Sequence, residues 1–359
     1  MSYNSYVILD DKIAVMDTVD GFFTEEWLNN VEQVLDGKMP DYLVIQHMEP
    51  DHSASIPAFL KKYPKVTVVS TAKGFQFMEQ FFPEFFAEQG LPAEQRIVAA
   101  NDGILELGQH SLHFVYAPMV HWPEVMMTYE ATEKILFAAD GFGKFGALDA
   151  EEEWADEARR YYIGIVGKYG PQVQAVLKKA AGLDIQTICS LHGPVLKENL
   201  GFYLEKYDKW SSYQPEESGV VIAYASVYGN TRSAAEYLAD VLQEKGQKTV
   251  LYDLARCDKA KAVADAFRYD RLVLAGITYN GDLFPCMRSF IEGLTERNYQ
   301  NRKVAIIENG TWAPMAGKLI LGMFEKSKNL TFTETTVSIK SAMNEQNKGE
   351  IGKLAEELC

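Results

Sequence analysis

The chain has 359 residues, a formal net charge of -15 and a hydrophobic content of 47%. This length allows two domains of ordinary size, and the composition is typical of a globular protein. The negative charge argues against nucleic acid or anionic lipid as a partner, and no apolar run is long enough to cross a membrane. Four cysteines without a C-x-x-C pair exclude a cysteine-ligated iron–sulfur or rubredoxin-like centre within this chain and favour reduced thiols in a cytoplasm.

In the first part of the chain, short apolar runs alternate with amphipathic stretches, which predicts strands and helices in turn. We expect strands at residues 6–9, 13–16, 42–45, 66–69, 104–107, 112–116, 125–129, 135–138 and 185–189. We expect helices at residues 24–36, 72–82, 155–166, 173–181 and 197–210. The polar segment 213–219 breaks the periodicity and is interpreted as a linker, so the predicted domains are 1–214 and 215–359.

Beyond the linker, five apolar runs alternate regularly with helical stretches. The strands are expected at residues 220–225, 249–252, 272–275, 304–307 and 333–338. This alternation predicts a parallel sheet covered by helices on both faces, that is, a small doubly wound α/β domain. Ligands of such a domain bind at the carboxyl ends of its strands.

The densest group of ionisable residues is the hexapeptide His47-Met48-Glu49-Pro50-Asp51-His52, directly after the predicted strand 42–45. We expect a loop here rather than a helix, because Pro50 has no N–H and disfavours helical backbone at the preceding residue. In an extended loop, His47, Glu49 and Asp51 point to one side. Two imidazoles and two carboxylates predict a metal site. The alternative is a polar loop whose side chains are satisfied by hydrogen bonds.

Three further candidate ligands, His121, Asp140 and His192, each follow a predicted strand, as His47 does. Residues at strand ends can converge at one edge of a sheet sandwich, so the joint pattern strengthens the metal hypothesis. His110 and His113 lie within or beside a strand, and we interpret both as structural.

One competing motif is Gly141-Phe142-Gly143-Lys144-Phe145-Gly146, which formally satisfies G-x-G-x-x-G after a strand. A dinucleotide site requires a helix to begin at once, so that its N-terminus faces the pyrophosphate. Here the helix is expected only near Glu151, and Asp140 would place a carboxylate against the phosphates. We therefore do not expect a nucleotide at this segment.

A second site is predicted in the C-terminal domain. The loop Ser226-Val227-Tyr228-Gly229-Asn230-Thr231 follows the first strand and begins a helix, so its hydroxyls and free N–H groups form an anion cradle. The loop lacks the Gly-Lys-Ser/Thr end of a nucleoside-triphosphatase motif, so a phosphomonoester fits better than a triphosphate. Two more loops follow strands, Thr278-Tyr279-Asn280-Gly281 and Asn309-Gly310-Thr311-Trp312.

The first of these loops resembles the phosphate loop of flavodoxins, which bind flavin mononucleotide (FMN). By this resemblance the other two loops flank the isoalloxazine ring, and Tyr279 and Trp312 supply aromatic surface for it. The alternative is a flavodoxin-like domain that has lost its cofactor.

The series His47-x-Glu49-x-Asp51-His52, His121, Asp140 and His192 resembles the metal-binding pattern of the flavodiiron proteins. In that family a metallo-β-lactamase-like αββα sandwich precedes a flavodoxin-like doubly wound parallel sheet. Hydrolases of the same superfamily carry histidine where this chain has Glu49, and a carboxylate suits iron better than zinc.

The resemblance implies two Fe ions and one FMN, with no catalytic residue beyond the metal ligands. It places His47, Glu49 and His121 at one iron, places Asp51, His52 and His192 at the other, and makes Asp140 the bridge. It covers nearly the whole chain from Tyr3 onward. Family members usually carry a further N-terminal stretch, so we expect either a late start or a missing edge strand. No rubredoxin-like extension follows Cys359, so the expected electron donor is a separate protein such as rubredoxin, or a reduced deazaflavin.

The implied function is a cytoplasmic oxidoreductase that reduces dioxygen to water, nitric oxide to nitrous oxide, or both. The sequence does not choose between these gases, because both are small and neutral. Two other functions stay open: a zinc hydrolase fused to a flavodoxin-like electron-transfer domain, and a flavin-only electron carrier. Because ligands and flavin loops fall on different domains, we expect a homodimer, or a dimer of dimers, in which the flavin of one chain faces the irons of another.

Overall fold

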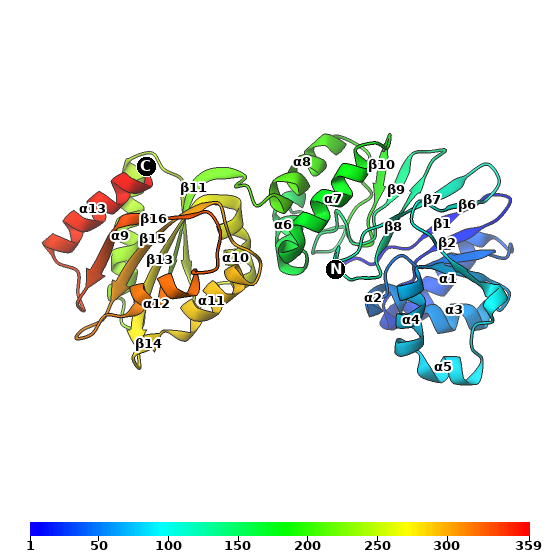
Figure 1. Ribbon diagram of the computed structural model, residues 1–359, viewed down its shortest axis with the longest axis horizontal. Helices are drawn as coiled ribbons and strands as arrows, with labels where there is room; N and C mark the ends of the chain where they lie inside the picture. Colours follow the sequence, from blue (N-terminus) through cyan, green and yellow to red (C-terminus); the bar gives the residue numbers. More distant parts are fainter. The chain divides into compact units, whose positions relative to one another are not determined.

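The computed structural model describes residues 1–359, which form two compact units (Figure 1). The first unit comprises residues 1–161 and 171–207, and the second comprises residues 162–170 and 208–359. The domain boundary after Gln214 stays a prediction. Residues 217–219 of the predicted linker begin a strand, in which Glu217 pairs with Tyr269 of the second unit. No helix combines the length and the apolar composition that crossing a membrane would require.

Two five-stranded sheets form the first unit, in the orders β1-β2-β3-β4-β5 and β10-β9-β8-β7-β6. Their strands are β1 Tyr6–Ile8, β2 Ala14–Met16, β3 Tyr42–Val44, β4 Thr67–Ser70, β5 Arg96–Val98, β6 Ile104–Glu106, β7 Ser111–Tyr116, β8 Met126–Glu130, β9 Ile135–Phe137 and β10 Thr187–Cys189. In the first sheet only the β1–β2 pair is antiparallel. In the second sheet only the β9–β10 pair is parallel.

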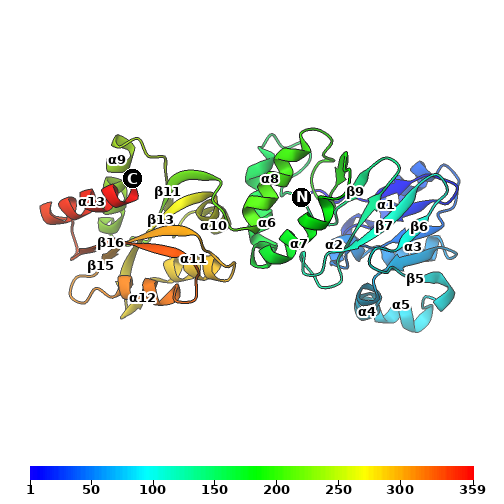
Figure 2. The same ribbon diagram turned by 45° about the horizontal axis from the view of Figure 1, so that its top comes forward.

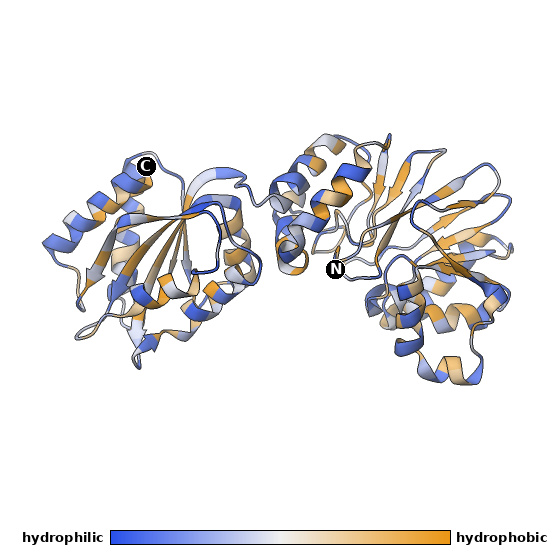
Figure 3. Ribbon diagram, viewed as in Figure 1, coloured by the Kyte–Doolittle hydropathy of each residue, from blue (hydrophilic) through white to orange (hydrophobic).

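The period-two alternation of the strands divides their apolar side chains between two cores. In β2, Ala14 and Met16 enter a core shared by the two sheets, whereas Val15 enters a core shared with helices. In Figure 3 the strands of this unit are coloured mostly as hydrophobic, and its helices carry both hydrophobic and hydrophilic residues. The helices on this side are α1 Thr24–Leu35, α3 Ile56–Lys62, α4 Ala72–Phe81 and α5 Pro83–Glu88.

Helices also cover the outer face of the second sheet. Helices α7 (Gly170–Ala180) and α8 (Leu200–Ser211) lie side by side (Figure 2), and their apolar side chains meet those of β7, β8 and β9. Helix α6 precedes them in the chain and spans Trp154–Ile165. The layers are therefore helix, sheet, sheet and helix, which confirms the predicted αββα sandwich.

The second unit contains a parallel sheet in the order β12-β11-β13-β15-β16, with the short β14 antiparallel to β13. Its strands are β11 Glu217–Tyr224, β12 Thr249–Asp253, β13 Tyr269–Tyr279, β14 Asp282–Leu283, β15 Arg302–Asn309 and β16 Leu330–Ile339. Its helices are α9 Asn230–Glu244, α10 Lys259–Arg268, α11 Pro285–Thr295, α12 Ala316–Met323 and α13 Glu345–Leu358. Helices α9 and α13 share one core with the sheet, and α10 and α12 contact its strands as well. The predicted doubly wound sheet is confirmed.

Candidate metal centre and cofactor pocket

The hexapeptide after β3 is partly helical, which corrects the expectation of a loop. Glu49 has extended backbone, with φ -59° and ψ 139°, and α2 (Pro50–Ser53) follows it directly. Pro50 occupies the first helical position, where a missing N–H breaks no hydrogen bond and the fixed φ suits the helix. The predicted alternation of His47, Glu49 and Asp51 on one side is therefore wrong for Asp51, which belongs to the helix.

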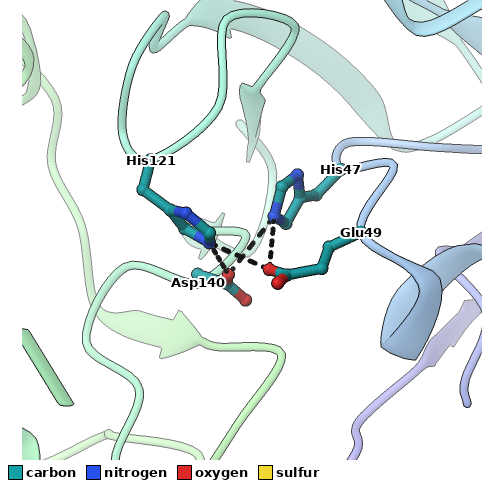
Figure 4. Close-up of side chains that lie close together, drawn as sticks. All are labelled: His47, Glu49, His121 and Asp140. Atoms are coloured by element: carbon teal, nitrogen blue, oxygen red, sulfur yellow. Dashed lines mark hydrogen bonds and ion pairs between the residues drawn. The ribbon is translucent and has the colours of Figure 1, made fainter. Parts of the chain in front are cut away.

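The seven predicted ligands gather in two groups. His47, Glu49, His121 and Asp140 form the first group (Figure 4), and their ligand atoms lie within 4.8 Å of one another. The second group consists of Asp51, His52 and His192, again within 4.8 Å. The structure thus brings together all seven residues, whose role as metal ligands stays a prediction.

Asp140 faces both groups with different oxygen atoms. Its Oδ2 lies 3.0 Å from Nε2 of His121 and 3.4 Å from Nε2 of His47. Its Oδ1 lies 3.1 Å from Nε2 of His52 and 3.5 Å from Nε2 of His192. A carboxylate that presents one oxygen to each of two ligand groups has the arrangement that bridging two metal ions requires.

The contacts in the second group fit a cation better than a set of mutual hydrogen bonds. The Nε2 atoms of His52 and His192 lie 3.0 Å apart, where two unprotonated nitrogens repel each other. Oδ2 of Asp51 lies 3.4 Å from Nε2 of His52 and 3.3 Å from Nε2 of His192, and Oδ1 of Asp140 is buried without a hydrogen-bond partner. Buried polar atoms rarely stay unsatisfied, and a cation bound between these four atoms would satisfy them.

The electrostatics of the cluster attract positive charge. Burial by itself raises the pKa of Asp140, but the charge of His52 and hydrogen bonds from His121 hold it well below its usual range. Burial likewise opposes ionisation of Glu49, yet bonding to His121 and His47 lowers its pKa to about 2. Burial alone lowers the pKa of His47, but Asp140 outweighs it and raises that pKa well above the usual range. The imidazole of His47 therefore holds a proton that a metal ion would replace.

A separate pocket of about 520 Å³ lies at the carboxyl ends of the strands of the second unit, within the size range of cofactor sites. All three predicted loops line it, and among their residues only Gly229 is not part of the lining. Gly229 has φ +91° at the start of α9, and its N–H donates to Oγ of Ser226 at 3.2 Å. A positive φ favours glycine, so Gly229 shapes the loop rather than touching the pocket.

Ser341, which the sequence analysis did not predict, also lines this pocket. Its N–H donates to Oδ1 of Asn309 at 3.1 Å, and Nδ2 of Asn309 donates to its carbonyl at 2.9 Å. Its hydroxyl lies 3.0 Å from that of Thr311. No lysine or arginine lines the pocket, so a phosphate placed here would depend on hydroxyls and on the N–H groups at the start of α9.

Comparison with known proteins follows the same division of the chain. Residues 1–193 match the family described as ODP family beta lactamase, and residues 221–330 match a flavodoxin domain. The flavodiiron protein from Giardia intestinalis has a TM-score of 0.84 and 25% identity, covering 99% of this chain and 89% of that chain. The chain belongs to the flavodiiron proteins. The predicted resemblance is confirmed.

Other similar proteins differ in their names and lengths. Diflavin flavoprotein A 1 from Synechocystis is 34% identical over 72% of this chain and 45% of its own length. This chain therefore spans less than half the length of that relative. A nitric oxide reductase from Moorella thermoacetica is 28% identical over 89% of this chain and 80% of its own length. Rubredoxin oxygen:oxidoreductase from Desulfovibrio gigas has a TM-score of 0.89 at 24% identity, covering 99% of this chain and 89% of that chain, and shares the fold.

Residues that support two of the candidate ligands of this flavodiiron protein were missed by the sequence analysis. The buried carboxylate of Glu124 accepts hydrogen bonds from Nδ1–H of His47 at 2.8 Å and from the N–H of Met48 at 2.9 Å. Nδ1–H of His192 donates to the carbonyl of Ser2 at 2.8 Å. Each bond keeps the proton on Nδ1 and leaves Nε2 free to bind a metal. The position of Glu124, three residues after His121, was the one signal available.

The segment Gly141–Gly146 lacks the immediate strand-to-helix turn that a dinucleotide site requires. After β9 no helix begins until Trp154, so no helix N-terminus faces this segment. The N–H of Gly143 instead donates to the carbonyl of Asp140 at 3.1 Å. His110 and His113 lie outside both ligand groups: Nδ1 of His110 is 3.2 Å from Glu130, and His113 lies within β7.

Proposed function

We propose that this protein is an oxidoreductase that reduces dioxygen, nitric oxide or both at two iron ions, with electrons supplied through FMN. The observation that carries this proposal is Asp140, whose two oxygens face two separate groups of histidines and carboxylates. A nitric oxide reductase and a rubredoxin oxygen:oxidoreductase among the similar proteins support the reaction class but do not choose the gas.

Two bound iron ions would supply redox-active, Lewis-acidic positions for a small gas. His47, Glu49 and His121 would hold one ion, and Asp51, His52 and His192 the other, with Asp140 between them. The three carboxylates offset the charge of the metals, and Glu49 adds the anionic oxygen that favours iron over zinc. Glu124 and the carbonyl of Ser2 fix the orientation of two of the imidazoles.

Conversion of dioxygen to water, or of a pair of nitric oxides to nitrous oxide and water, also consumes protons. Tyr161 is buried beside this centre, with its ring centroid 5.5 Å from that of His192. Burial, and next to it the charge of Asp140, raise the pKa of Tyr161 well above its ordinary value. Its Oη therefore keeps its proton at neutral pH and is a proton-holding group at the centre.

The proposal includes a donor and an assembly. The donor is a separate protein such as rubredoxin, or a reduced deazaflavin, and the cellular compartment is the cytoplasm, in line with four free cysteines. The assembly is a head-to-tail homodimer or a dimer of such dimers. It is supported by Tyr228 and Trp312 at the flavin pocket, which are 92% and 90% exposed in the single chain. Exposed aromatic side chains are typical of residues buried in interfaces.

The experiment is an anaerobic single turnover of protein loaded with iron and FMN. After reduction, the protein is mixed with dioxygen or nitric oxide, and flavin reoxidation and gas consumption are followed. We expect two irons and one FMN per chain and rapid consumption of at least one gas. Stoichiometric zinc without iron, or no reaction with either gas, would overturn the proposal in favour of the zinc-hydrolase or electron-carrier alternatives.

A further inference from the structure

An apolar cavity of about 30 Å³ lies between helices α7 and α8 and the outer face of the second sheet. Its lining residues are aliphatic or aromatic apart from one glycine and Met127, and Tyr207 is the only one with a side-chain nitrogen or oxygen. The hydroxyl of Tyr207 accepts a hydrogen bond from the N–H of Phe142 at 2.6 Å, and the two rings stack with centroids 4.2 Å apart. The polar atom is therefore engaged by the backbone.

Such a cavity does not suit water. A buried water molecule needs two to four polar partners, whereas cavities lined by aliphatic and aromatic side chains stay dry and bind benzene or xenon. The volume exceeds the roughly 10–15 Å³ that one water-sized probe occupies. Dioxygen and nitric oxide are apolar or nearly so and consist of two atoms, so they match both the lining and the volume.

The position of the cavity connects it with the metal centre. Its lining includes Val120 and Gly141, which are the chain neighbours of the candidate ligands His121 and Asp140. On the helix side the lining includes Leu177, which is only partly buried. One wall is therefore built from the segments that carry two ligands, and another wall lies close to solvent.

We propose that this cavity is a docking site for an apolar diatomic gas, dioxygen or nitric oxide, that supplies the metal centre. The gas role rests on the proposed function, whereas the affinity of the cavity for an apolar atom does not. The competing explanation is a void left by imperfect packing, which would have no effect on the reaction with gas.

The first measurement uses xenon as the probe. Crystals of the protein loaded with iron and FMN are pressurised with xenon, and the xenon positions are determined by anomalous diffraction. We expect a xenon atom between α7 and β9 in the unmodified protein and none in Val176→Phe, whose larger side chain fills the cavity. The matched control is Ala175→Phe, because Ala175 is exposed on the same helix. Absence of xenon from this cavity would overturn the docking site.

The second measurement is the second-order rate constant for reoxidation of the reduced protein by each gas. We expect Val176→Phe to lower it by about three- to tenfold, since the supply of gas limits association. Iron and flavin content, and the rate of reduction by the donor, should match those of Ala175→Phe. If Val176→Phe does not fold, Ala180→Leu fills the same cavity and takes its place. An unchanged rate constant in a folded variant with a filled cavity would overturn the gas role.

The two proposals fail in different ways. Xenon in the cavity of a protein that consumes neither gas would overturn the proposed reductase function and the gas role together, while the affinity for apolar atoms stands. Gas consumption at full rate by Val176→Phe would overturn only the docking proposal.

Discussion

Glu49 is the residue whose chemistry most affects the choice of metal. Its Oε2 lies 3.0 Å from Nε2 of His121 and 3.3 Å from Nε2 of His47, so all three can reach one ion. A carboxylate at this position makes the ligand group more anionic and harder than three imidazoles would, which favours ferrous iron over zinc.

We predict that Glu49→His lowers the iron content and raises the zinc content of the protein. The substitution replaces an anionic oxygen by a neutral nitrogen, which zinc accepts more readily. Metal analysis of protein reconstituted with equal amounts of both ions tests this. Glu26→His on the exposed side of α1 is the matched control. Equal iron content in Glu49→His and in the control would contradict the assignment of Glu49 as a ligand.

Glu124 acts through His47 and is a positioning residue. We predict that Glu124→Ala lowers the affinity for ferrous iron by about 10- to 100-fold, as is usual when a hydrogen-bond partner of a ligand is lost. Glu124→Gln keeps an acceptor oxygen without the charge, so it should restore part of the affinity. Competition with a chelator gives both affinities. Equal losses in the two variants would show that the negative charge of the carboxylate, and not its acceptor oxygen, supports His47, and an unchanged affinity in Glu124→Ala would contradict the positioning role.

At the scale of elements, most strands of both units could be predicted because buried strands are apolar along their whole length. The strand β5 (Arg96–Val98) was missed because it lies at a sheet edge and is partly exposed, so it carries no such pattern. The helix α2 was missed because proline was interpreted as a helix breaker, although it is favoured at the first helical position.

The candidate ligands could be predicted because each follows a strand and has a chemically distinctive side chain. The contacts that support these ligands could not be predicted from the sequence. The carbonyl of Ser2 accepts a hydrogen bond from His192, which lies 190 positions later in the sequence. Every residue has a backbone carbonyl, so the residue type at position 2 does not indicate this contact. Ser341 joins the flavin pocket through bonds to Asn309 that depend on the register of β15 and β16.

The flavin loops belong to the second unit, so their variants should leave the metals in place. We predict that Thr231→Ala weakens FMN binding by about 2 kcal/mol, some thirtyfold in Kd, through loss of one hydrogen bond to the phosphate. Trp312→Ala should mainly shift the flavin potential. Thr331→Ala is the matched control for Thr231, since Thr331 is exposed at the start of β16 and does not line the pocket. Flavin titration, potentiometry and iron analysis test both variants; loss of iron in either would contradict independent sites.

At the scale of the whole molecule, the seven candidate ligands lie in one unit and the flavin loops in the other. Electron transfer from FMN to iron requires the two sites to come close. In a dimer with two-fold symmetry, the flavin of each chain can face the irons of the other chain. Two equivalent contacts then form, and the assembly is closed. This arrangement makes a prediction that separates transfer between chains from transfer within a chain.

The prediction concerns a mixed dimer of two defective chains. One chain lacks flavin through Gly229→Val and Thr231→Ala, and the other lacks iron through His52→Ala and His192→Ala. In a head-to-tail dimer, the intact flavin of the second chain still faces the intact irons of the first, so about half of the activity should survive, because one of two equivalent contacts remains. Each defective homodimer serves as a control and should be inactive. A folded mixed dimer without activity would mean that electrons pass within one chain, because there no single chain keeps both sites.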